Sequence, residues 1–271
     1  MAPASTARSR PLRADAPEPY ARPDLYDLLF SRFDADLPFW LEVARGGPGE
    51  PSGAVLDLCC GTGRVLVPLL EAGHEVEGVD LYPGMLALAR SNAAARGHAP
   101  RLIAADMRSF ETRRRYAAIV IPFNAFAHNL STEDQLATLA RCHAHLEPGG
   151  RLAFDVFSAT PAMLAEPAGE SAMELEIEDP RDGRHVQLWD DRRLDVAAQI
   201  QHSRIEVREF ALDGSPATVH RFDTRVRWVH RFELELLLRL AGFTRADLWG
   251  GPDRGPVTAD TAMLFTVARR E

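Results

Sequence analysis

The strongest chemical signal in the sequence is a short glycine turn that follows an apolar run. Residues 55–64 read Val-Leu-Asp-Leu-Cys-Cys-Gly-Thr-Gly-Arg. Glycines between a buried strand and a helix let the backbone approach a ligand closely, and the helix N-terminus favours a negative group. A dinucleotide-binding turn would carry a third glycine at position 66, where this chain has Leu66. The turn therefore predicts a nucleotide-like ligand other than a pyrophosphate.

Three carboxylates accompany the turn and favour a ligand with positive charge. Asp57 lies inside the first apolar run, Asp80 ends the next one, and Asp106 follows the third. Asp80 can accept both hydroxyls of a ribose, and Asp106 can accept from an exocyclic amine while Met107 covers an adenine face. Negative groups around a pocket suit a sulfonium and an amino group better than a pyrophosphate.

Alternating strand and helix patterns are expected to position these residues. Apolar runs predict buried parallel strands at 54–58, 75–79, 101–105, 117–121 and 151–157, with helical patterns between them at 63–72, 84–96 and 132–145. Helical spacing also covers 25–43, where Pro38 divides the segment into two helices. This alternation predicts a doubly wound, mostly parallel seven-stranded sheet with helices on both faces, an α/β fold.

The pattern changes after residue 160. Alternating apolar and polar residues over 172–229, with turn signals at Asp182-Gly183 and Asp213-Gly214, predict an antiparallel cap of three or four strands. A helix at 231–241 and strands near 245–249 and 261–268 return to the main sheet. We expect a core of 20–160 and 230–271, a cap of 161–229 over the active site, and a disordered tail of 1–19 rich in Ala, Pro and Arg.

The composition of the chain argues against nucleic acid and membrane partners. The chain has 271 residues and a formal net charge of −8, and all 31 basic residues are arginine. An acidic chain without a dense basic stripe is poorly suited to a phosphate backbone, so we expect no nucleic acid partner. With no long apolar run and only three cysteines, we expect a cytoplasmic protein that contacts no membrane, either a monomer or a homodimer.

Five segments in order resemble the successive motifs of class I S-adenosylmethionine-dependent methyltransferases. The segments are Asp57-x-x-x-Gly61-x-Gly63, Gly78-Val-Asp80, Ala105-Asp106-Met107, Pro122-Phe123-Asn124 and 146–152, Leu-Glu-Pro-Gly-Gly-Arg-Leu. The resemblance covers most of the chain outside the tail and the cap, and its cap-bearing members include the glycine/sarcosine and amino-sugar N-methyltransferase-like groups. It implies S-adenosylmethionine as cofactor. It also implies methyl transfer by in-line displacement to a nitrogen or oxygen atom of a small molecule.

The resemblance also implies roles for individual residues. Glycines at the turn would lie under the methionine part, Asp80 would hold the ribose, and Asp106 with Met107 would bind adenine. The family often has glycine at position 59, where this chain has Cys59. The full set of expected cofactor-binding residues is Tyr20, Tyr26, Asp57, Cys60, Gly61, Gly63, Arg64, Asp80, Leu81, Asp106, Met107 and Phe123.

Candidates for the acceptor side are fewer. His128, just after the fourth strand, is the candidate catalytic base, although it could instead be a helix-start histidine satisfied by the backbone. Asn124, Trp189, Arg204, Arg225 and Trp228 are candidate substrate contacts. Cys142-His143-Ala-His145 has no metal-binding geometry on a helix, because residues two apart point in different directions, so we expect no metal.

The sequence leaves two alternative functions open. A non-catalytic relative that binds S-adenosylmethionine would share the cofactor motifs, and an NAD(P)-dependent oxidoreductase has a similar sheet. Leu66 and the additional acid Asp106 count against the oxidoreductase.

Overall fold

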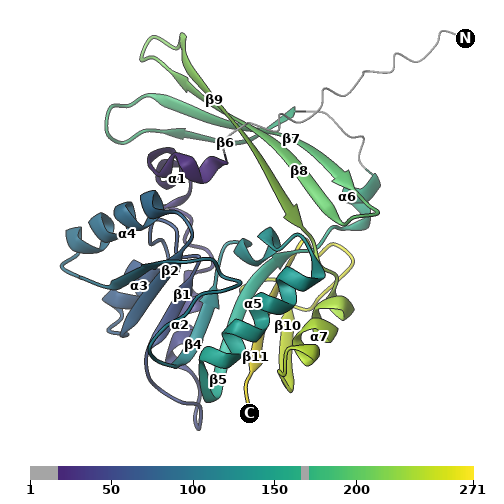
Figure 1. Cartoon of the computed structure of the whole chain (residues 1–271). Helices are drawn as coiled ribbons and strands as arrows, with labels where there is room; N and C mark the ends of the chain where they lie inside the picture. The colour runs from purple at the N-terminus through teal and green to yellow at the C-terminus, as the bar shows by residue number, and fades with distance from the viewer. Residues whose placement is uncertain (1–17, 166–170) are drawn as a thin grey trace, which may run out of the picture.

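The computed structural model describes residues 18–165 and 171–271, and it consists of an α/β core with a separate β-sheet across its top (Figure 1). The core sheet has seven strands in the order β10-β11-β5-β4-β1-β2-β3. These strands are β1 (Val55–Leu58), β2 (Val76–Asp80), β3 (Arg101–Ala104), β4 (Tyr116–Ile121), β5 (Leu146–Phe157), β10 (Arg245–Trp249) and β11 (Met263–Arg269). β11 runs antiparallel to both of its neighbours, and the other pairings are parallel. The predicted fold class is confirmed.

Helices cover both faces of this sheet. α2 (Leu37–Arg45), α3 (Leu66–Glu71) and α4 (Pro83–Ala95) bury apolar side chains on one face, whereas α5 (Thr132–His145) and α7 (Arg231–Leu240) pack on the other. Trp40, fully buried on α2, donates its Nε1–H to Asp36 at 2.8 Å. Ser131 caps α5 by accepting from the Asp134 amide. Pro38 lies in the first turn of α2, as the sequence predicts.

The strand order reverses between β1 and β4, and this position determines where a ligand can bind. β1 pairs with β2 on one side and with β4 on the other. In open α/β sheets, ligands bind beyond the carboxyl ends of the strands at such a reversal. The glycine turn follows β1 and the Pro122-Phe123-Asn124 segment follows β4, so both flank this crevice.

A four-stranded antiparallel sheet forms the cap, in the order β6-β7-β8-β9. Its strands are β6 (Ser171–Glu178), β7 (His185–Asp195), β8 (Ile200–Phe210) and β9 (Pro216–Arg227). Gly183 and Gly214 adopt positive φ at the two predicted hairpin turns. α6 (Pro161–Ala165) precedes the cap, and of the predicted tail only its last residues are described, with a 3₁₀ helix, η1 (Pro19–Ala21); residues 1–17 lie outside the described residues.

One face of the cap packs on α1 (Pro23–Phe30). Val186, Leu188, Val207 and Phe222 form an apolar cluster there with α1 residues including Leu25. Burying this apolar surface favours packing of the cap on the core. α1 therefore lies between the two sheets and links them.

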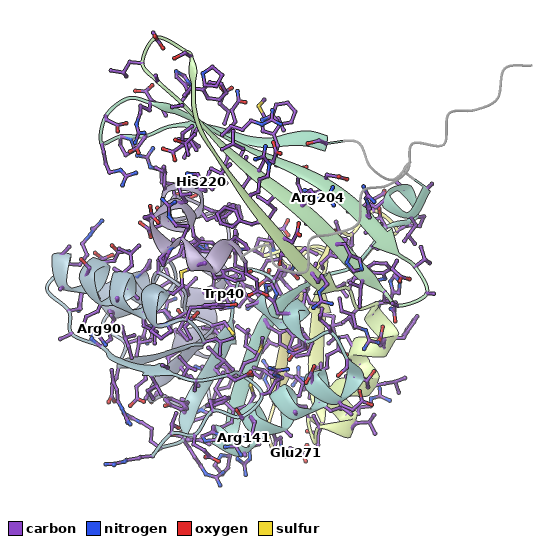
Figure 2. All side chains as sticks on the ribbon, turned by 45° about the horizontal axis from the view of Figure 1, so that its top comes forward. Trp40, Arg90, Arg141, Arg204, His220 and Glu271 are labelled. Atoms are coloured by element: carbon purple, nitrogen blue, oxygen red, sulfur yellow. The ribbon has the colours of Figure 1, made fainter. Side chains whose placement is uncertain are left out.

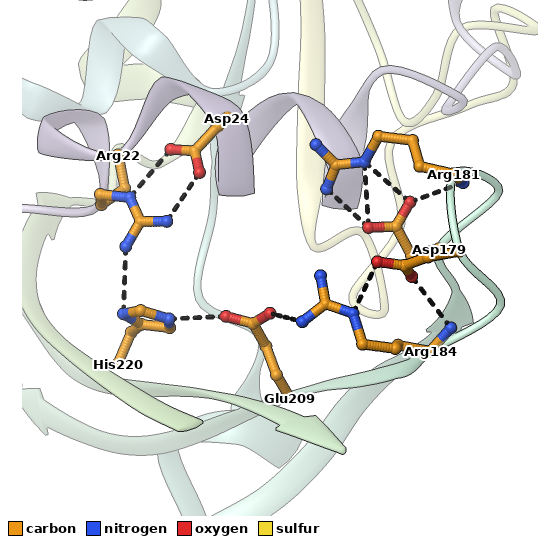
Figure 3. Close-up of polar contacts among 8 residues, drawn as sticks. Arg22, Asp24, Asp179, Arg181, Arg184, Glu209 and His220 are labelled. Atoms are coloured by element: carbon orange, nitrogen blue, oxygen red, sulfur yellow. Dashed lines mark hydrogen bonds and ion pairs between the residues drawn. The ribbon is translucent and has the colours of Figure 1, made fainter. Parts of the chain in front are cut away.

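Polar contacts join α1 to the cap at one end of this cluster (Figure 3). Arg22 contacts His220 Nδ1 at 3.2 Å, and His220 Nε2 contacts Glu209 at 2.7 Å. Glu209 also pairs with Arg184 at 3.0 Å. We call Arg22, His220, Glu209 and Arg184 the α1–cap clamp.

Across the described residues, no helix is long and apolar enough to cross a membrane.

Candidate active site

The glycine turn after β1 has three positions in the left-handed backbone region. Cys59, Gly61 and Gly63 have φ of 66°, 55° and 93°. A glycine adopts these angles without strain, whereas Cys59 does not. The Gly63 amide donates to the Cys60 carbonyl at 2.9 Å, which closes the turn before α3. The turn therefore exposes backbone at the carboxyl end of β1.

Asp80, at the end of β2, is oriented by two backbone amides. Its Oδ2 accepts from Gly61 N and its Oδ1 accepts from Tyr82 N, both at 2.9 Å. Burial raises the pKa of Asp80, and these two hydrogen bonds oppose the shift. Each carboxylate oxygen has a further lone pair, so Asp80 can accept from the two hydroxyls of a ribose.

Asp106 and Met107 follow β3. Arg108 donates to both oxygens of Asp106, and this pairing keeps the pKa of Asp106 below its usual range. Met107 Sδ accepts from Asn129 Nδ2 at 3.4 Å, which fixes the thioether beside Asp106. An ionised carboxylate beside a positioned thioether suits the edge and the face of an adenine ring.

A second strained turn follows β4. Phe123 and Asn124 both have positive φ, at 62° and 58°. Asn124 N donates to Asp155 Oδ2 at 2.9 Å, and Asn124 Oδ1 accepts from Phe157 N at 2.8 Å. These two bonds to β5 hold the turn in a costly conformation. η2 (Ala125–His128) begins directly after it.

These turns surround a cavity of about 700 Å³. Its size is in the usual range for a cofactor or drug-sized ligand. From the core it is lined by residues that include Tyr26, Cys60, Gly61, Arg64, Asp80, Leu81, Tyr82, Asp106, Met107, Phe123 and Asn129, and from the cap by His202, Asp223, Thr224 and Arg225. We call it the cofactor cavity.

The acids Glu18, Asp80, Asp106 and Asp223 and the arginines Arg64, Arg108 and Arg225 line this cavity, and further carboxylates are buried behind it. Arg64 stacks over the Phe123 ring at 4.8 Å and forms a two-pronged ion pair with Asp36 at 2.6 and 2.8 Å. Two further carboxylates, Asp57 and Asp155, lie near this single guanidinium, and burial raises the pKa of each to about 7. Buried carboxylates that exceed their counter-ions favour a cationic ligand. A sulfonium with an amino group fits this charge balance, and a pyrophosphate does not.

Comparison with known proteins agrees with this geometry. Residues 55–150 match a family model described as a methyltransferase domain. A dTDP-3-amino-3,4,6-trideoxy-alpha-D-glucopyranose N,N-dimethyltransferase from Streptomyces venezuelae is 28% identical over 241 residues, 84% of this chain and 92% of that protein. A glycine/sarcosine/dimethylglycine N-methyltransferase from Actinopolyspora halophila is 37% identical over 127 residues, but these span only 22% of that protein and 46% of this chain.

A solved S-adenosylmethionine-dependent methyltransferase from Clostridium acetobutylicum shares the fold, with a TM-score of 0.75 and 18% identity. It covers 91% of this chain and 96% of its own. The chain is a class I S-adenosylmethionine-dependent methyltransferase. The cofactor predicted from the sequence is therefore confirmed, and the oxidoreductase reading is set aside.

The methyltransferase has a second, smaller cavity beside the cofactor cavity, with a volume of about 280 Å³. Its wall is largely apolar, with Leu25, Leu29, Leu188, Ile205, Val207, Phe222, Val226 and Met263 among its lining residues. Tyr20, Tyr26, Phe30, Phe123, His128 and Thr224 line both cavities and so mark the boundary between them. We call it the acceptor cavity.

Tyr20 and His128 form a hydrogen-bonded pair at this boundary. Tyr20 Oη lies 2.6 Å from His128 Nε2, and the two rings meet edge to face. Burial lowers the pKa of His128, while the charge of Glu18 and a backbone hydrogen bond with Arg225 raise it. Burial also raises the pKa of Tyr20. At neutral pH both groups are therefore uncharged, and in the His128 tautomer protonated at Nδ1 the tyrosine hydroxyl donates to Nε2.

Most of the expected cofactor-binding residues line the cofactor cavity: Tyr20, Tyr26, Cys60, Gly61, Arg64, Asp80, Leu81, Asp106, Met107 and Phe123. Asp57 and Gly63 do not. Asp57 is fully buried, and Gly63 shapes the turn and packs toward Ala89. The cavity lining therefore gives no support to a direct contact of these two residues with the cofactor, and their assignment stays a prediction.

Of the residues predicted to act on the acceptor side, some line one of the two cavities and others line neither. Asn124 and His128 line the acceptor cavity, and Arg225 lines the cofactor cavity. Trp189 lies on the cap face opposite Ile205 and stacks with Arg208, while Trp228 is buried against Phe157. Arg204, labelled on the cap sheet in Figure 2, pairs with Asp191 and Asp223. The strand register places it on the same face as Trp189. Trp189, Trp228 and Arg204 line neither cavity, so the cavities give no support to their assignment to the substrate, which stays a prediction.

Sequence reasoning missed Asp155 and the apolar cap residues of the acceptor cavity. Strand alternation shows that cap residues divide between two faces, but it does not show which face is inward. The only sequence signal for Asp155 is a single acid inside the apolar run Ala153-Phe-Asp-Val-Phe157.

Proposed function

We propose that this methyltransferase transfers the methyl group of S-adenosylmethionine to an amine nitrogen of a small molecule. The observation that carries the proposal is the Tyr20–His128 pair, which lies at the boundary between the cofactor cavity and a small apolar cavity. The relative from Streptomyces venezuelae, matched over nearly its whole length, acts on the amino group of a sugar. An amino sugar is therefore the first acceptor to test.

The pair is suited to remove a proton from the acceptor. An amine must be unprotonated to attack, because the reacting electron pair is the one that binds the proton. The Tyr20 oxygen can accept a proton from the acceptor nitrogen while its own proton moves to His128 Nε2, 2.6 Å away. Because burial keeps His128 neutral, its Nε2 is available for that proton near pH 7.

The remaining residues position and enclose the reactants. When bound, S-adenosylmethionine supplies an electrophilic methyl group on a sulfonium. Asp80 and the turn at Gly61 hold the ribose side, and Phe123 and Tyr26 form the wall shared by both cavities. The apolar cap face over the acceptor cavity excludes water from the reacting atoms. Alignment and water exclusion supply most of the acceleration in a displacement of this kind.

Turnover with amine acceptors tests the proposal. S-adenosylhomocysteine formation would be followed with a panel of amino sugars, amino acids, phenols and hydroxylated sugars, to separate nitrogen from oxygen acceptors. We expect turnover with an amine, and turnover only with phenols or alcohols would overturn the nitrogen assignment. If S-adenosylmethionine binds in calorimetry and no acceptor in the panel reacts, the non-catalytic reading is favoured.

The Tyr20–His128 pair is tested by His128→Asn and Tyr20→Phe. We expect kcat to fall about 10²-fold in His128→Asn and at least as much in Tyr20→Phe, because Tyr20 takes the proton directly from the acceptor; this factor is the lower end for loss of a proton acceptor. The affinity for S-adenosylhomocysteine should stay within about twofold, whereas Asp80→Ala should abolish it. His185→Asn, on an exposed cap strand, is the matched control. An unchanged kcat in His128→Asn would contradict a role in proton removal.

A further inference from the structure

Asp155 is a buried carboxylate in the wall of the acceptor cavity. It lies on β5, is 4% exposed, and lines the acceptor cavity but not the cofactor cavity. Most of its neighbours in that wall are aliphatic or aromatic. A carboxylate in such a position is costly unless another group compensates its charge.

The hydrogen bonds of Asp155 are incomplete. Oδ2 accepts from the Asn124 amide at 2.9 Å, whereas Oδ1 is buried and has no hydrogen-bond partner among the described residues. A carboxylate oxygen left in this state loses its hydration without replacement. A structural role in holding the Asn124 turn would require only the first oxygen, so the hydrogen-bonding capacity of the second is unused.

Arg64 offsets the charge of Asp155 only in part, since burial still raises the pKa of Asp155. That guanidinium donates from both terminal nitrogens to Asp36, and both side chains of the pair are at most 9% exposed. Arg64 also serves Asp57, whose pKa it lowers against the effect of burial. One arginine thus faces three carboxylates, and a further positive charge would complete the balance.

The acceptor cavity provides no such charge itself. Within the described part of the chain, Asp155 is the only acid in its wall, and no arginine lines it. Tyr20, His128 and Asn124, the polar side chains nearest the boundary, are neutral. A cation that entered this cavity would therefore meet a single counter-ion.

We propose that Asp155 is the specificity-determining residue that selects a protonated amine as acceptor and stabilises the positive charge that develops on its nitrogen. The inference rests on the proposed amine methylation. The ammonium binds with its N–H groups toward Asp155 and loses one proton through Tyr20 to His128. The nitrogen lone pair then forms the C–N bond as the C–S bond breaks, and its electron pair goes to sulfur. Positive charge moves from sulfur to nitrogen, where Asp155 stabilises it.

Asp155→Asn separates the charge from the structural role. The amide oxygen of asparagine can still accept from Asn124 N, so the turn after β4 is retained while the negative charge is lost. Asp190→Asn is the matched control. Asp190 is also buried, at 7% exposure, and pairs with Arg192, but it lines neither cavity.

The first experiment measures binding of two probes of the same shape to the full-length protein saturated with S-adenosylhomocysteine. Cyclohexylammonium carries a charge at neutral pH and cyclohexanol does not. We expect wild type and Asp190→Asn to bind the ammonium at least tenfold more tightly than the alcohol, and Asp155→Asn to lose this preference. Equal binding of the probes to wild type, or a preference that survives in Asp155→Asn, would overturn the inference.

Turnover of an amine accepted by the wild type provides the second readout. In Asp155→Asn we expect KM to rise and kcat to fall, because both the bound ammonium and the transition state lose their counter-ion. Affinity for S-adenosylhomocysteine should be unchanged. Wild-type turnover that Asp155→Asn leaves intact overturns only the role of Asp155. A wild type that methylates no amine contradicts the proposed function, while the probe preference is still measured separately.

Discussion

Of the five non-glycine residues with positive φ in the described part of the chain, three line the two cavities. Cys59 follows β1, and Phe123 and Asn124 follow β4, all with positive φ. Each costs about 1 kcal/mol or more relative to a relaxed conformation. At Asn124 the conformation is held by hydrogen bonds to Asp155 and Phe157. Cys59 instead contacts Met107, with its Sγ 3.8 Å from the thioether sulfur.

The backbone at Cys59 gives a sharp prediction. Glycine should be tolerated, because it adopts φ near 66° without strain, whereas a β-branched valine strongly disfavours it. We expect Cys59→Gly to retain affinity for S-adenosylhomocysteine within about threefold and Cys59→Val to lose at least tenfold. Calorimetry measures both. Cys142→Val, in the buried core on α5, is the control, and equal affinities of the two Cys59 variants would contradict the role of backbone strain.

Individual residues differ in how well their roles could be predicted. The role of Asp80 was predictable because the carboxyl ends of parallel strands lie together at the edge of the sheet where ligands bind. Asp57 lies inside its strand. The sequence predicts that its negative charge favours a cationic ligand, but it does not predict that the side chain lies outside the cavity lining. Asp155 could not be recognised from sequence, because an acid in a buried strand becomes a site residue only through the turn that packs against it.

Elements were predicted better than their mutual arrangement. The cap strands follow from alternation and two Asp-Gly turns, and α1 follows from helical spacing. Their contact does not, because it joins segments such as Arg22 and His220 that are 198 residues apart. Trp189 is an example. A strand pattern does not show which face of the cap a residue occupies, and a residue on the face away from α1 does not reach the acceptor cavity.

The α1–cap clamp is expected to keep α1 in place against the cap. His220→Ala removes the contacts to both Arg22 and Glu209, and it should destabilise the protein by about 1 kcal/mol. We expect faster hydrogen exchange of the α1 amides and a raised KM for the acceptor, because α1 lines its cavity. Arg221→Ala is the control, because Arg221 lies next to His220 on β9 and its ion pair with Glu206 of β8 does not involve α1. Unchanged exchange in α1 would show that the apolar cluster alone fixes the helix.

For the whole molecule, the concentration of negative charge at the site couples folding to ligand binding. Asp57 is completely buried, and burial raises its pKa to about 7 from an unfolded value near 4. A group with a raised folded pKa stabilises the fold when protonated. That contribution is complete at low pH, is lost as pH rises through the folded pKa, and is constant above it. In the protein without cofactor, the ionised Asp57 therefore lowers the free energy of unfolding at pH 7 and above.

Removing this charge should change the pH dependence of stability in a defined direction. We expect Asp57→Asn to gain stability relative to wild type as pH rises from 5 to 7, by at most about 1.4 kcal/mol per pH unit, and the difference to level off above pH 7. Urea unfolding at each pH measures this, and histidines and cysteines cancel because both proteins share them. Since a cationic cofactor stabilises the ionised carboxylate, S-adenosylmethionine should stabilise wild type increasingly over the same interval and Asp57→Asn less so. A difference between the two proteins that is independent of pH would mean that Asp57 keeps an ordinary pKa in the fold, and the preference for a cation would then have to come from Asp155 and Asp80.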